Sequence, residues 1–443
     1  MTARIAIHPA VALIDVPRAI TLSGFAAHTP VTLTLTSKQA DGQVWRSRNV
    51  YLLDANGAID VAQQAPESGA YAGVDGQGPF WSQSVLLTDD ADAALLLAPA
   101  GADGAIHTLA SATDGHGNHA SARIEQHYAA PGAVRQELRQ DGLVGTLYLP
   151  AGPGPHPAIV VLNGSGGGIN DARAALFASH GYAALALGYF GAPGLPDYLS
   201  GIPLEYFERA LQWLRHTVKP AGDFVAVSGH SRGGELALLL GSLYPRAVSA
   251  VIAYVPSSVV HGVLNAGKPG EGRFKPAWTQ GGQALAHVWE QNAAQDWSLV
   301  DALPEPRRQA QAFVQAQQDE TAVARARIPV ERIAGPVLLL SAGDDGYWPS
   351  TQYARDVAQA LKAADHPHAV EHHDYPQAGH ALQAPHVPTT ELARAHAVSG
   401  VVLTGGGDAA ANARANVDSW ETVHRFLSNA VAQHTPLAVA HAG

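Results

Sequence analysis

The pentapeptide Gly229-His230-Ser231-Arg232-Gly233 has the pattern G-x-S-x-G and stands between an apolar run, residues 224–227, and a run of helix-forming residues. In this setting the pattern predicts a nucleophile elbow, a sharp strand-to-helix turn that presents the Ser231 hydroxyl to a base. The same turn directs nearby N–H groups toward the oxyanion that develops during attack. The flanking glycines leave room for the turn. An ordinary glycine-rich turn between a strand and a helix is the alternative.

An acid is expected next along the chain, because in this kind of fold the serine is followed first by an acid and then by a histidine. Residues 336–340 have the composition of a buried strand and lead into Asp344 and Asp345. Acids there would lie at the carboxyl edge of a doubly wound sheet, where ligands bind. We predict that Asp345 orients the histidine, since Pro349 follows it by four residues as in comparable hydrolases. Asp344 is the alternative, and capping of the next helix is another role for either.

His380 is the predicted general base among the 22 histidines of the chain. Residues 369–375 alternate like a strand, and His380 lies on the loop that follows, directly after a glycine that frees this loop. Histidines 372 and 373 lie within the same strand and suggest a metal site at first sight. Adjacent strand residues point to opposite faces, whereas metal ligands must converge, so we predict no metal site there.

A glycine-rich segment, residues 163–168, follows a buried strand predicted over residues 158–162. Glycine allows backbone N–H groups to approach a substrate oxygen closely, as the oxyanion loop of esterases does. We predict that the N–H groups of Arg232, Gly164 and Ser165 stabilise the oxyanion. A phosphate-binding loop is the rival interpretation, but no lysine follows the glycines as that motif requires.

The domain organisation is read from the change in pattern along the chain. Residues 1–128 show short alternating strands and Asp/Asn/Gly turns, which predict an all-β, immunoglobulin-like sandwich, and residues 129–133 form a linker. Strands and helices alternate over residues 134–443, which predicts a doubly wound, mostly parallel sheet with helices on both faces. Segment 256–326 is too long for a simple connection and contains a predicted helix over 307–323. We expect a lid over the substrate pocket there, with a packed helical crossover as the alternative.

The composition limits the partners that the chain can have. The net charge of −11 without a basic block argues against nucleic acid or an anionic membrane as the main partner. No apolar stretch of about 18 residues occurs and the first residues do not resemble a leader, so we expect a cytoplasmic protein. The chain has no cysteine, which excludes disulfides and cysteinyl metal sites. No cofactor is implied.

Several stretches occur in one order along nearly the whole chain. They are 68–75, 80–82, 148–155 with 163–168, 231–236, 328–336 with 344–345 and 348, and 379–380. In this order they resemble the acyl-CoA thioesterases of the bile acid-CoA:amino acid N-acyltransferase family. The resemblance implies an α/β-hydrolase fold behind a β-sandwich, a Ser231-His380-Asp345 triad, and hydrolysis of an acyl thioester through an acyl-enzyme without a cofactor.

Two departures from this family matter for the chemistry. The bile-acid-conjugating member has cysteine as its nucleophile, whereas this chain has Ser231. The oxygen ester formed on a serine is more naturally hydrolysed by water than transferred to an amine. The family commonly has lysine where this chain has Arg232, which keeps the charge and changes its geometry. Hydrolysis is therefore favoured. An acyl-CoA:amino acid N-acyltransferase, a carboxylesterase or amide hydrolase without coenzyme A, and a non-enzymatic binding module are the alternatives.

Coenzyme A is a polyanion, so an acyl-CoA substrate would need a local basic patch on a chain that is acidic overall. Solubility of the surface explains any single basic residue equally well. The candidates in and near the predicted lid are Arg273, Lys275, Arg308, Arg325 and Arg327.

Overall fold

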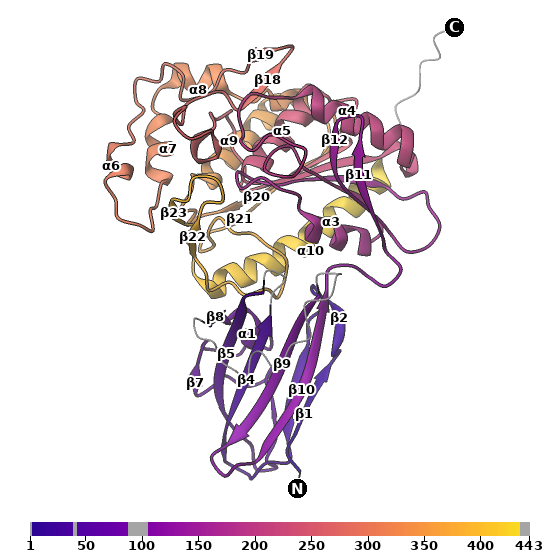
Figure 1. Ribbon diagram of the computed structural model, residues 1–443, viewed down its shortest axis with the longest axis vertical. Helices are drawn as coiled ribbons and strands as arrows, with labels where there is room; N and C mark the ends of the chain where they lie inside the picture. The colour runs from indigo at the N-terminus through magenta and orange to yellow at the C-terminus, as the bar shows by residue number, and fades with distance from the viewer. Residues whose placement is uncertain (1, 39–41, 87–104, 435–443) are drawn as a thin grey trace. The chain divides into compact units, whose positions relative to one another are not determined.

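The computed structural model describes residues 2–38, 42–86 and 105–434, and these form two compact units (Figure 1). Unit 1 comprises residues 1–129, 383–392 and 408–417, and unit 2 comprises residues 130–382, 393–407 and 418–443. Two short segments from the last quarter of the chain therefore group with the N-terminal residues.

The N-terminal part of unit 1, residues 2–38, 42–86 and 105–129, forms a β-sandwich, as the sequence predicts. One sheet contains β1 (Arg4–His8), β3 (Ala19–Ser23) and β6 (Ile59–Asp60). The other contains β2 (Val11–Leu13), β10 (His119–His127), β9 (Ile106–Asp114), β4 (Pro30–Lys38), β5 (Val44–Leu52) and β7 (Ser68–Gly69), with β8 (Ser84–Val85) also paired to β5 and α1 (Gly78–Trp81) nearby in sequence. Alternate residues of the strands, such as Leu22 of β3 and Leu33 of β4, share one buried core. This alternation is the period-two pattern of strands with one buried face.

Unit 2 is built on an eight-stranded, mostly parallel sheet. In spatial order the strands are β11 (Val134–Gln140), β12 (Leu143–Leu149), β14 (Ala183–Leu187), β13 (Ala158–Leu162), β16 (Val225–His230), β17 (Ala250–Tyr254), β20 (Val337–Ala342) and β21 (Val370–Tyr375). Strand β12 pairs antiparallel with both of its neighbours, β11 and β14, and the pairs from β14 to β21 are parallel. The central parallel strands β13, β14 and β17 are apolar and buried throughout, because helices cover both faces of such a sheet, whereas the edge strand β21 is polar and half-buried.

Helices lie on both sides of this sheet, which confirms the predicted doubly wound fold (Figure 1). One side has α4 (Glu205–Trp213), which continues as a π-helical turn (Leu214–Val218), α5 (Arg232–Leu243) and α9 (Ser350–Ala363); the other has α3 (Asp171–Ser179) and the C-terminal part of α10 (Ala409–Gln433). Val160 of β13 shares a core with Leu236 of α5 and Val357 of α9. On the opposite side Phe177 of α3 packs against Trp420 of α10 with ring centroids 5.0 Å apart.

The insertion, residues 256–326, is compact rather than a simple connection. It contains β18 (Trp278–Gln280), β19 (Gln283–Ala284), α6 (Ser298–Asp301), α7 (Ala310–Ala316) and α8 (Glu320–Ala326), grouped in orange in Figure 1. β18 pairs with β15 (Ile202–Pro203), and beyond the insertion β22 (Ala393–Ala395) pairs with β23 (Val402–Thr404). Trp289, Trp297 and Phe313 of the insertion form an aromatic core with Trp348.

The single helix predicted over 307–323 is wrong, because two helices, α7 and α8, occupy this region. Asp319 separates them: its backbone is not helical, and its side chain accepts a hydrogen bond from the Ala322 N–H. Aspartate competes for backbone donors in this way and starts a new helix.

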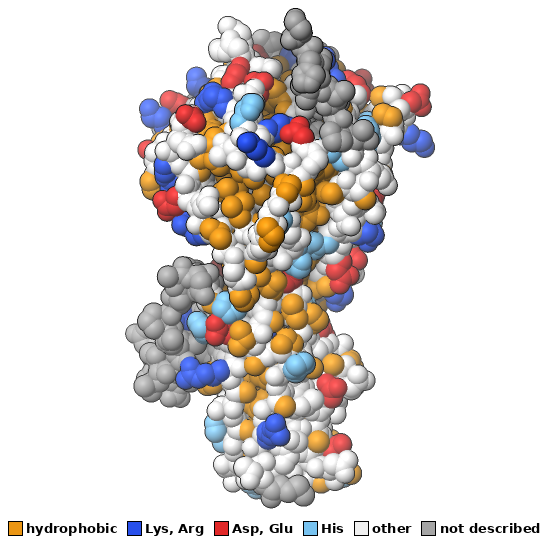
Figure 2. All heavy atoms as spheres, turned by 90° about the vertical axis from the view of Figure 1, so that its right-hand side faces the viewer, with side chains coloured by type: hydrophobic (Ala, Val, Ile, Leu, Met, Phe, Trp, Pro, Cys, Tyr) orange, Lys and Arg blue, Asp and Glu red, His pale blue; other side chains and the backbone are white. Residues whose placement is uncertain are grey.

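No helix within residues 2–38, 42–86 and 105–434 is long and apolar enough to cross a membrane. On the face shown in Figure 2, Lys and Arg side chains are intermixed with Asp and Glu side chains. Charges of both signs are therefore interspersed on this face of the molecule.

Candidate active site

Ser231 lies on the turn between β16 and α5, with φ 59° and ψ −119°. A non-glycine residue with positive φ is strained, and such strain concentrates at functional sites. The Ser231 N–H donates to the Tyr254 carbonyl at 2.9 Å, which helps to fix the turn. A Cβ at Gly229 would lie 1.9 Å from the Gly233 carbonyl oxygen, and a Cβ at Gly233 would lie 2.5 Å from the Asn163 carbonyl oxygen. Both flanking glycines are therefore required by the packing of the turn.

His380 and Asp345 meet at the carboxyl edge of the sheet, after the neighbouring strands β21 and β20. His380 Nδ1–H donates to the Asp345 carboxylate, with distances of 2.9 Å to Oδ1 and 2.8 Å to Oδ2. Both residues are buried. The Asp345 Oδ1 also accepts the N–H of Tyr347 at 2.8 Å, which fixes the carboxylate. Because Nδ1 carries the proton in this arrangement, Nε2 of a neutral His380 is left as the basic nitrogen.

No hydrogen bond joins Ser231 to His380 among the described residues. His380 Nε2 is buried and has no hydrogen-bond partner there. Asp345 and His380 are therefore hydrogen-bonded to each other, and the described residues show no hydrogen bond from this pair to Ser231. Hydrogen bonds between catalytic groups are often long or unaligned before substrate binds, and the Ser231-His380-Asp345 triad stays a prediction.

Asp344, the alternative acid, makes its hydrogen bonds to groups other than His380. Its carboxylate accepts the Arg308 guanidinium at 2.6 Å and the Gly407 N–H at 2.8 Å. Partial burial opposes ionisation, but these two donors lower the pKa of Asp344 below its usual value. Asp344 therefore braces the loop after β20 and does not contact the His380 ring.

Aromatic rings and one further histidine surround the His380 side chain and its backbone. Tyr347 stacks on the His380 ring with centroids 4.4 Å apart, and Trp348 packs edge-on at 5.8 Å. His230 Nε2–H donates to the His380 carbonyl oxygen at 2.8 Å. Burial and the neighbouring His380 lower the pKa of His230 well below its usual value, which keeps this ring neutral. His230 stands inside the pentapeptide, but the G-x-S-x-G pattern predicts no role for the residue at this position.

The predicted oxyanion donors lie beside Ser231. A Cβ added at Gly164 would be 3.4 Å from the Ser231 Cβ, so the 163–168 loop abuts the elbow. Within this loop the N–H groups of Gly167 and Gly168 already donate to main-chain carbonyls, at 3.2 Å and 2.9 Å. Arg232 is the first residue of α5, where N–H groups have no intrahelical partner. The role of the Arg232, Gly164 and Ser165 N–H groups as oxyanion donors stays a prediction.

The Arg232 side chain is buried and turned away from solvent. Its guanidinium donates to Glu235 Oε2 at 2.8 Å and to the carbonyls of His261 and Gly262 at 3.2 Å and 2.7 Å. The indole N–H of Trp278 donates to the other Glu235 oxygen at 2.9 Å. Burial raises the pKa of Glu235, and Arg232 and Trp278 oppose the rise. Arg232 thus ties the start of α5 to the insertion.

A small cavity of about 20 Å³ lies over Ser231, enough space for about one water molecule. Its lining residues are Ser165, Ser231, Arg232, Leu264, Asn265, Gln309, Phe313, Tyr347, Trp348, His396 and Leu403. Leu264, Asn265, Gln309 and Phe313 belong to the insertion, which therefore forms one wall of this cavity. A mobile lid over residues 256–326 stays a prediction.

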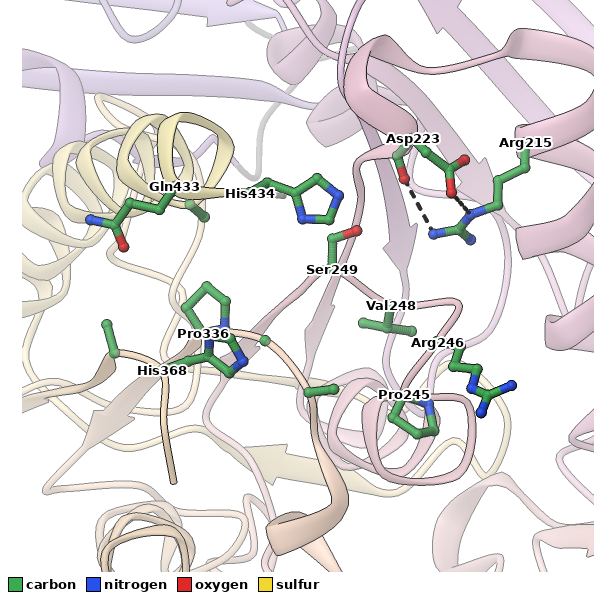
Figure 3. Close-up of a pocket in the computed structure, with 14 residues that line it drawn as sticks. Arg215, Asp223, Pro245, Arg246, Val248, Ser249, Pro336, His368, Gln433 and His434 are labelled. Carbon is green, nitrogen blue, oxygen red and sulfur yellow. Dashed lines mark hydrogen bonds and ion pairs between the residues drawn. The ribbon is translucent and has the colours of Figure 1, made fainter. Parts of the chain in front are cut away.

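A larger cavity, of about 360 Å³, lies at the opposite edge of the sheet (Figure 3). Val248 and Ser249 precede β17, Pro336 precedes β20, and His368 precedes β21, so this cavity faces the amino ends of the strands. Ligands of open α/β sheets bind at the carboxyl ends instead. Arg215 in this cavity is engaged by the Asp223 carboxylate at 3.0 Å. We therefore do not place the reaction here.

Most of the candidate phosphate-binding residues are engaged by protein groups. Three are ion-paired: Arg273 with Asp301, Arg308 with Asp344, and Arg327 with Glu331. Arg325 donates to the Glu290 carbonyl, and Lys275 is exposed. These pairs agree with the interpretation of the basic residues as surface charges.

A doubly wound sheet that carries a serine on a strained strand-to-helix turn defines the α/β hydrolases, and this chain is one of them. Residues 202–433 match the family model described as BAAT / Acyl-CoA thioester hydrolase C terminal. Residues 15–140 match the model described as Acyl-CoA thioester hydrolase/BAAT N-terminal region. The chain belongs to this family and is an enzyme.

Relatives of similar length include acyl-coenzyme A thioesterase 1 of Rattus norvegicus, 30% identical over 93% of both chains. Acyl-coenzyme A thioesterase 2, mitochondrial, of Homo sapiens is 29% identical over 95% of this chain and 82% of the relative. Among solved structures, Pyrococcus horikoshii acylaminoacyl peptidase aligns with a TM-score of 0.40 at 13% identity, over 94% of this chain and 59% of that chain. The expected family resemblance is thus confirmed over nearly the whole chain.

Proposed function

We propose that the protein hydrolyses an acyl-CoA thioester through an acyl-enzyme on Ser231, with His380 as general base and Asp345 as the residue that orients it. The hydrogen bond from His380 Nδ1–H to the Asp345 carboxylate, at the same sheet edge as the elbow, is the observation that carries the proposal. The names of the relatives support coenzyme A as the leaving group.

In the first half-reaction His380 Nε2 takes the Ser231 proton while Oγ forms a bond to the thioester carbon, and the carbonyl electron pair moves onto oxygen. The N–H groups of Arg232, Gly164 and Ser165 would stabilise this oxyanion. When the oxyanion collapses the C–S bond breaks, and the departing thiolate receives the proton from His380.

In the second half-reaction a water molecule attacks the acyl-enzyme, giving its proton to His380. The C–Oγ bond then breaks, Ser231 regains a proton, and the free acid leaves. An amine could replace water, as the N-acyltransferase alternative requires. Because the acyl-enzyme is an oxygen ester, we expect water to be the preferred acceptor.

The test is Ser231→Ala, assayed with a series of acyl-CoA substrates and matched aryl esters. Loss of about 10³-fold or more in kcat in a folded protein is expected, together with loss of labelling by a fluorophosphonate. Ser242→Ala is the matched control, because this buried serine of α5 only donates within its own helix, to Leu238. Full turnover in Ser231→Ala would contradict the mechanism. Turnover of aryl esters alone would favour the carboxylesterase alternative, and no labelling of the wild type would favour a binding module.

A further inference from the structure

Ser165 and His396 form a hydrogen-bonded pair in the wall of the small cavity over Ser231. The distance between Ser165 Oγ and His396 Nε2 is 2.9 Å. His396 follows β22, far along the chain from the glycine-rich loop, and is buried at 8% exposure. Both residues line the cavity to which Ser231 also contributes. No motif in the sequence relates these two residues.

The direction of this hydrogen bond follows from the other ring nitrogen. His396 Nδ1 lies 3.3 Å from the N–H of Val398 and 3.4 Å from the N–H of Ser399, so Nδ1 accepts. Burial, and to a lesser degree the nearby Arg232, lower the pKa of His396 to about 4. A neutral ring with an acceptor at Nδ1 carries its proton on Nε2. His396 therefore donates to the Ser165 oxygen.

A hydroxyl that accepts this bond still has its own hydrogen to donate. Ser165 directly follows Gly164, which abuts Ser231, and it is one of the residues that line the same cavity. A carbonyl oxygen bound next to Ser231 would be an acceptor within this small space. A donor that is itself hydrogen-bonded is polarised, which strengthens the bond that it makes.

We propose that the Ser165 hydroxyl is a side-chain donor to the oxyanion, and that His396 is a positioning residue that fixes its rotamer through the Nε2–H···Oγ bond. This inference rests on the proposed function, because it requires attack by Ser231. It adds to that proposal a catalytic side chain at Ser165, separate from the Ser165 backbone N–H, and a role for a histidine outside the triad.

Ser165→Ala separates the two groups of this residue, because it removes the hydroxyl and keeps the N–H. With an acyl-CoA that the wild type accepts, we expect kcat to fall by about 10²- to 10³-fold with KM changed less than about twofold. Affinity for an alkyl trifluoromethyl ketone, which forms a tetrahedral adduct with serine, should fall by a similar factor. Ser242→Ala is again the control for loss of a buried hydroxyl.

The role of His396 is tested by a double-mutant cycle. His396→Phe should lower kcat in the wild-type background and have little further effect beside Ser165→Ala, because the two residues act through one bond. His396→Gln keeps a donor near the Nε2 position and should lose less than His396→Phe. If His396→Phe does not fold, Ser165→Ala and the ketone still decide the proposal.

Two outcomes would overturn the inference. The first is a Ser165→Ala enzyme with kcat within about twofold of wild type. The second is a Ser165→Ala enzyme in which only KM changes, which would mean that Ser165 and His396 form part of the cavity wall and do not stabilise the oxyanion. Ser231→Ala is run in parallel. If Ser231→Ala remains active, the proposed function itself fails; if it is inactive while Ser165→Ala is unimpaired, only the side-chain donor fails.

Discussion

His230 donates its Nε2–H to the main-chain carbonyl of His380 across 2.8 Å, so the residue before the proposed nucleophile holds the backbone of the proposed base. The two rings also meet edge to face, with centroids 5.2 Å apart. The elbow and the histidine loop are therefore joined directly, although no hydrogen bond between the described residues links Ser231 to His380.

His230→Phe should lower kcat by about one order of magnitude, because misplacement of the base by a fraction of an ångström weakens proton transfer. Steady-state kinetics measure the loss. The matched control is His366→Phe, since His366 Nε2 donates in the same way to a main-chain carbonyl, that of Gly335, at 3.0 Å. Equal losses in both variants would show that the effect reflects general packing and not the position of His380.

Asp345→Asn should cost about 10³- to 10⁴-fold in kcat, because an amide can donate to Nδ1 and so favours the wrong tautomer of His380. Asp344→Asn should cost much less, because Asp344 contacts Arg308 and the Gly407 N–H instead. Both are read from kcat at saturating substrate. If Asp344→Asn lowered kcat more than Asp345→Asn, Asp344 and not Asp345 would be the acid that orients His380.

Replacing the proposed nucleophile tests the acyl acceptor. The wild type, given an acyl-CoA that it accepts and millimolar glycine or taurine, should release free acid with little N-acyl product. Ser231→Cys, which introduces a thiol into a chain that has no cysteine, should shift the products measurably toward the amide if it remains active. Mass spectrometry of the products decides, and mainly N-acyl amino acid from the wild type would make this chain an acyltransferase.

Stability should fall as the pH is lowered from about 6.5 toward 4. Burial lowers the pKa of both His396 and His386 to about 4, so between these values the unfolded chain binds protons that the folded chain does not. The stability from each neutral ring is complete above pH 6.5 and is lost as pH falls, by up to about 3 kcal/mol per ring. Urea unfolding at several pH values measures it. His396→Gln should show a shallower decline, and an unchanged slope would contradict the assignment of a neutral buried ring.

Arg232→Met should destabilise the protein by about 3 to 5 kcal/mol, because Glu235 would be left as an unpaired buried carboxylate. Arg327→Met is the comparison, since its pair with Glu331 is largely exposed and should contribute at most about 1 kcal/mol. Urea unfolding of the two variants provides both values. A similar small effect at both positions would mean that Glu235 is neutral in the fold.

The elbow and the acid–histidine pair could be anticipated because each depends on local order along the chain. A buried strand followed by Asp345, and the next strand followed by His380, place both residues at one edge once these strands pair in parallel. The break at Asp319 was also readable in principle, since aspartate is a strong helix start. A single helix is expected there because good helix formers, such as Ala316 and Ala322, stand on both sides of Asp319.

The pairing of Ser165 with His396 could not be anticipated. The pairing requires the segment around β22 and β23 to lie next to the glycine-rich loop. It also requires a hydrogen bond to His396 Nδ1 that leaves the ring proton on Nε2. The contacts of the Arg232 side chain could not be anticipated either, because its guanidinium donates to the carbonyls of His261 and Gly262 in the insertion. Contacts between segments distant in sequence leave no local pattern.

The positive φ of Ser231 links turnover to resistance against heat. A backbone in this region costs of order 1–3 kcal/mol for a side-chain-bearing residue, and glycine would relieve much of it. Selection for thermal tolerance alone would therefore drive this position toward glycine, while selection for activity keeps the hydroxyl. The two pressures oppose each other at one residue, so a chain that no longer needs its reaction should lose the proposed nucleophile and become harder to unfold.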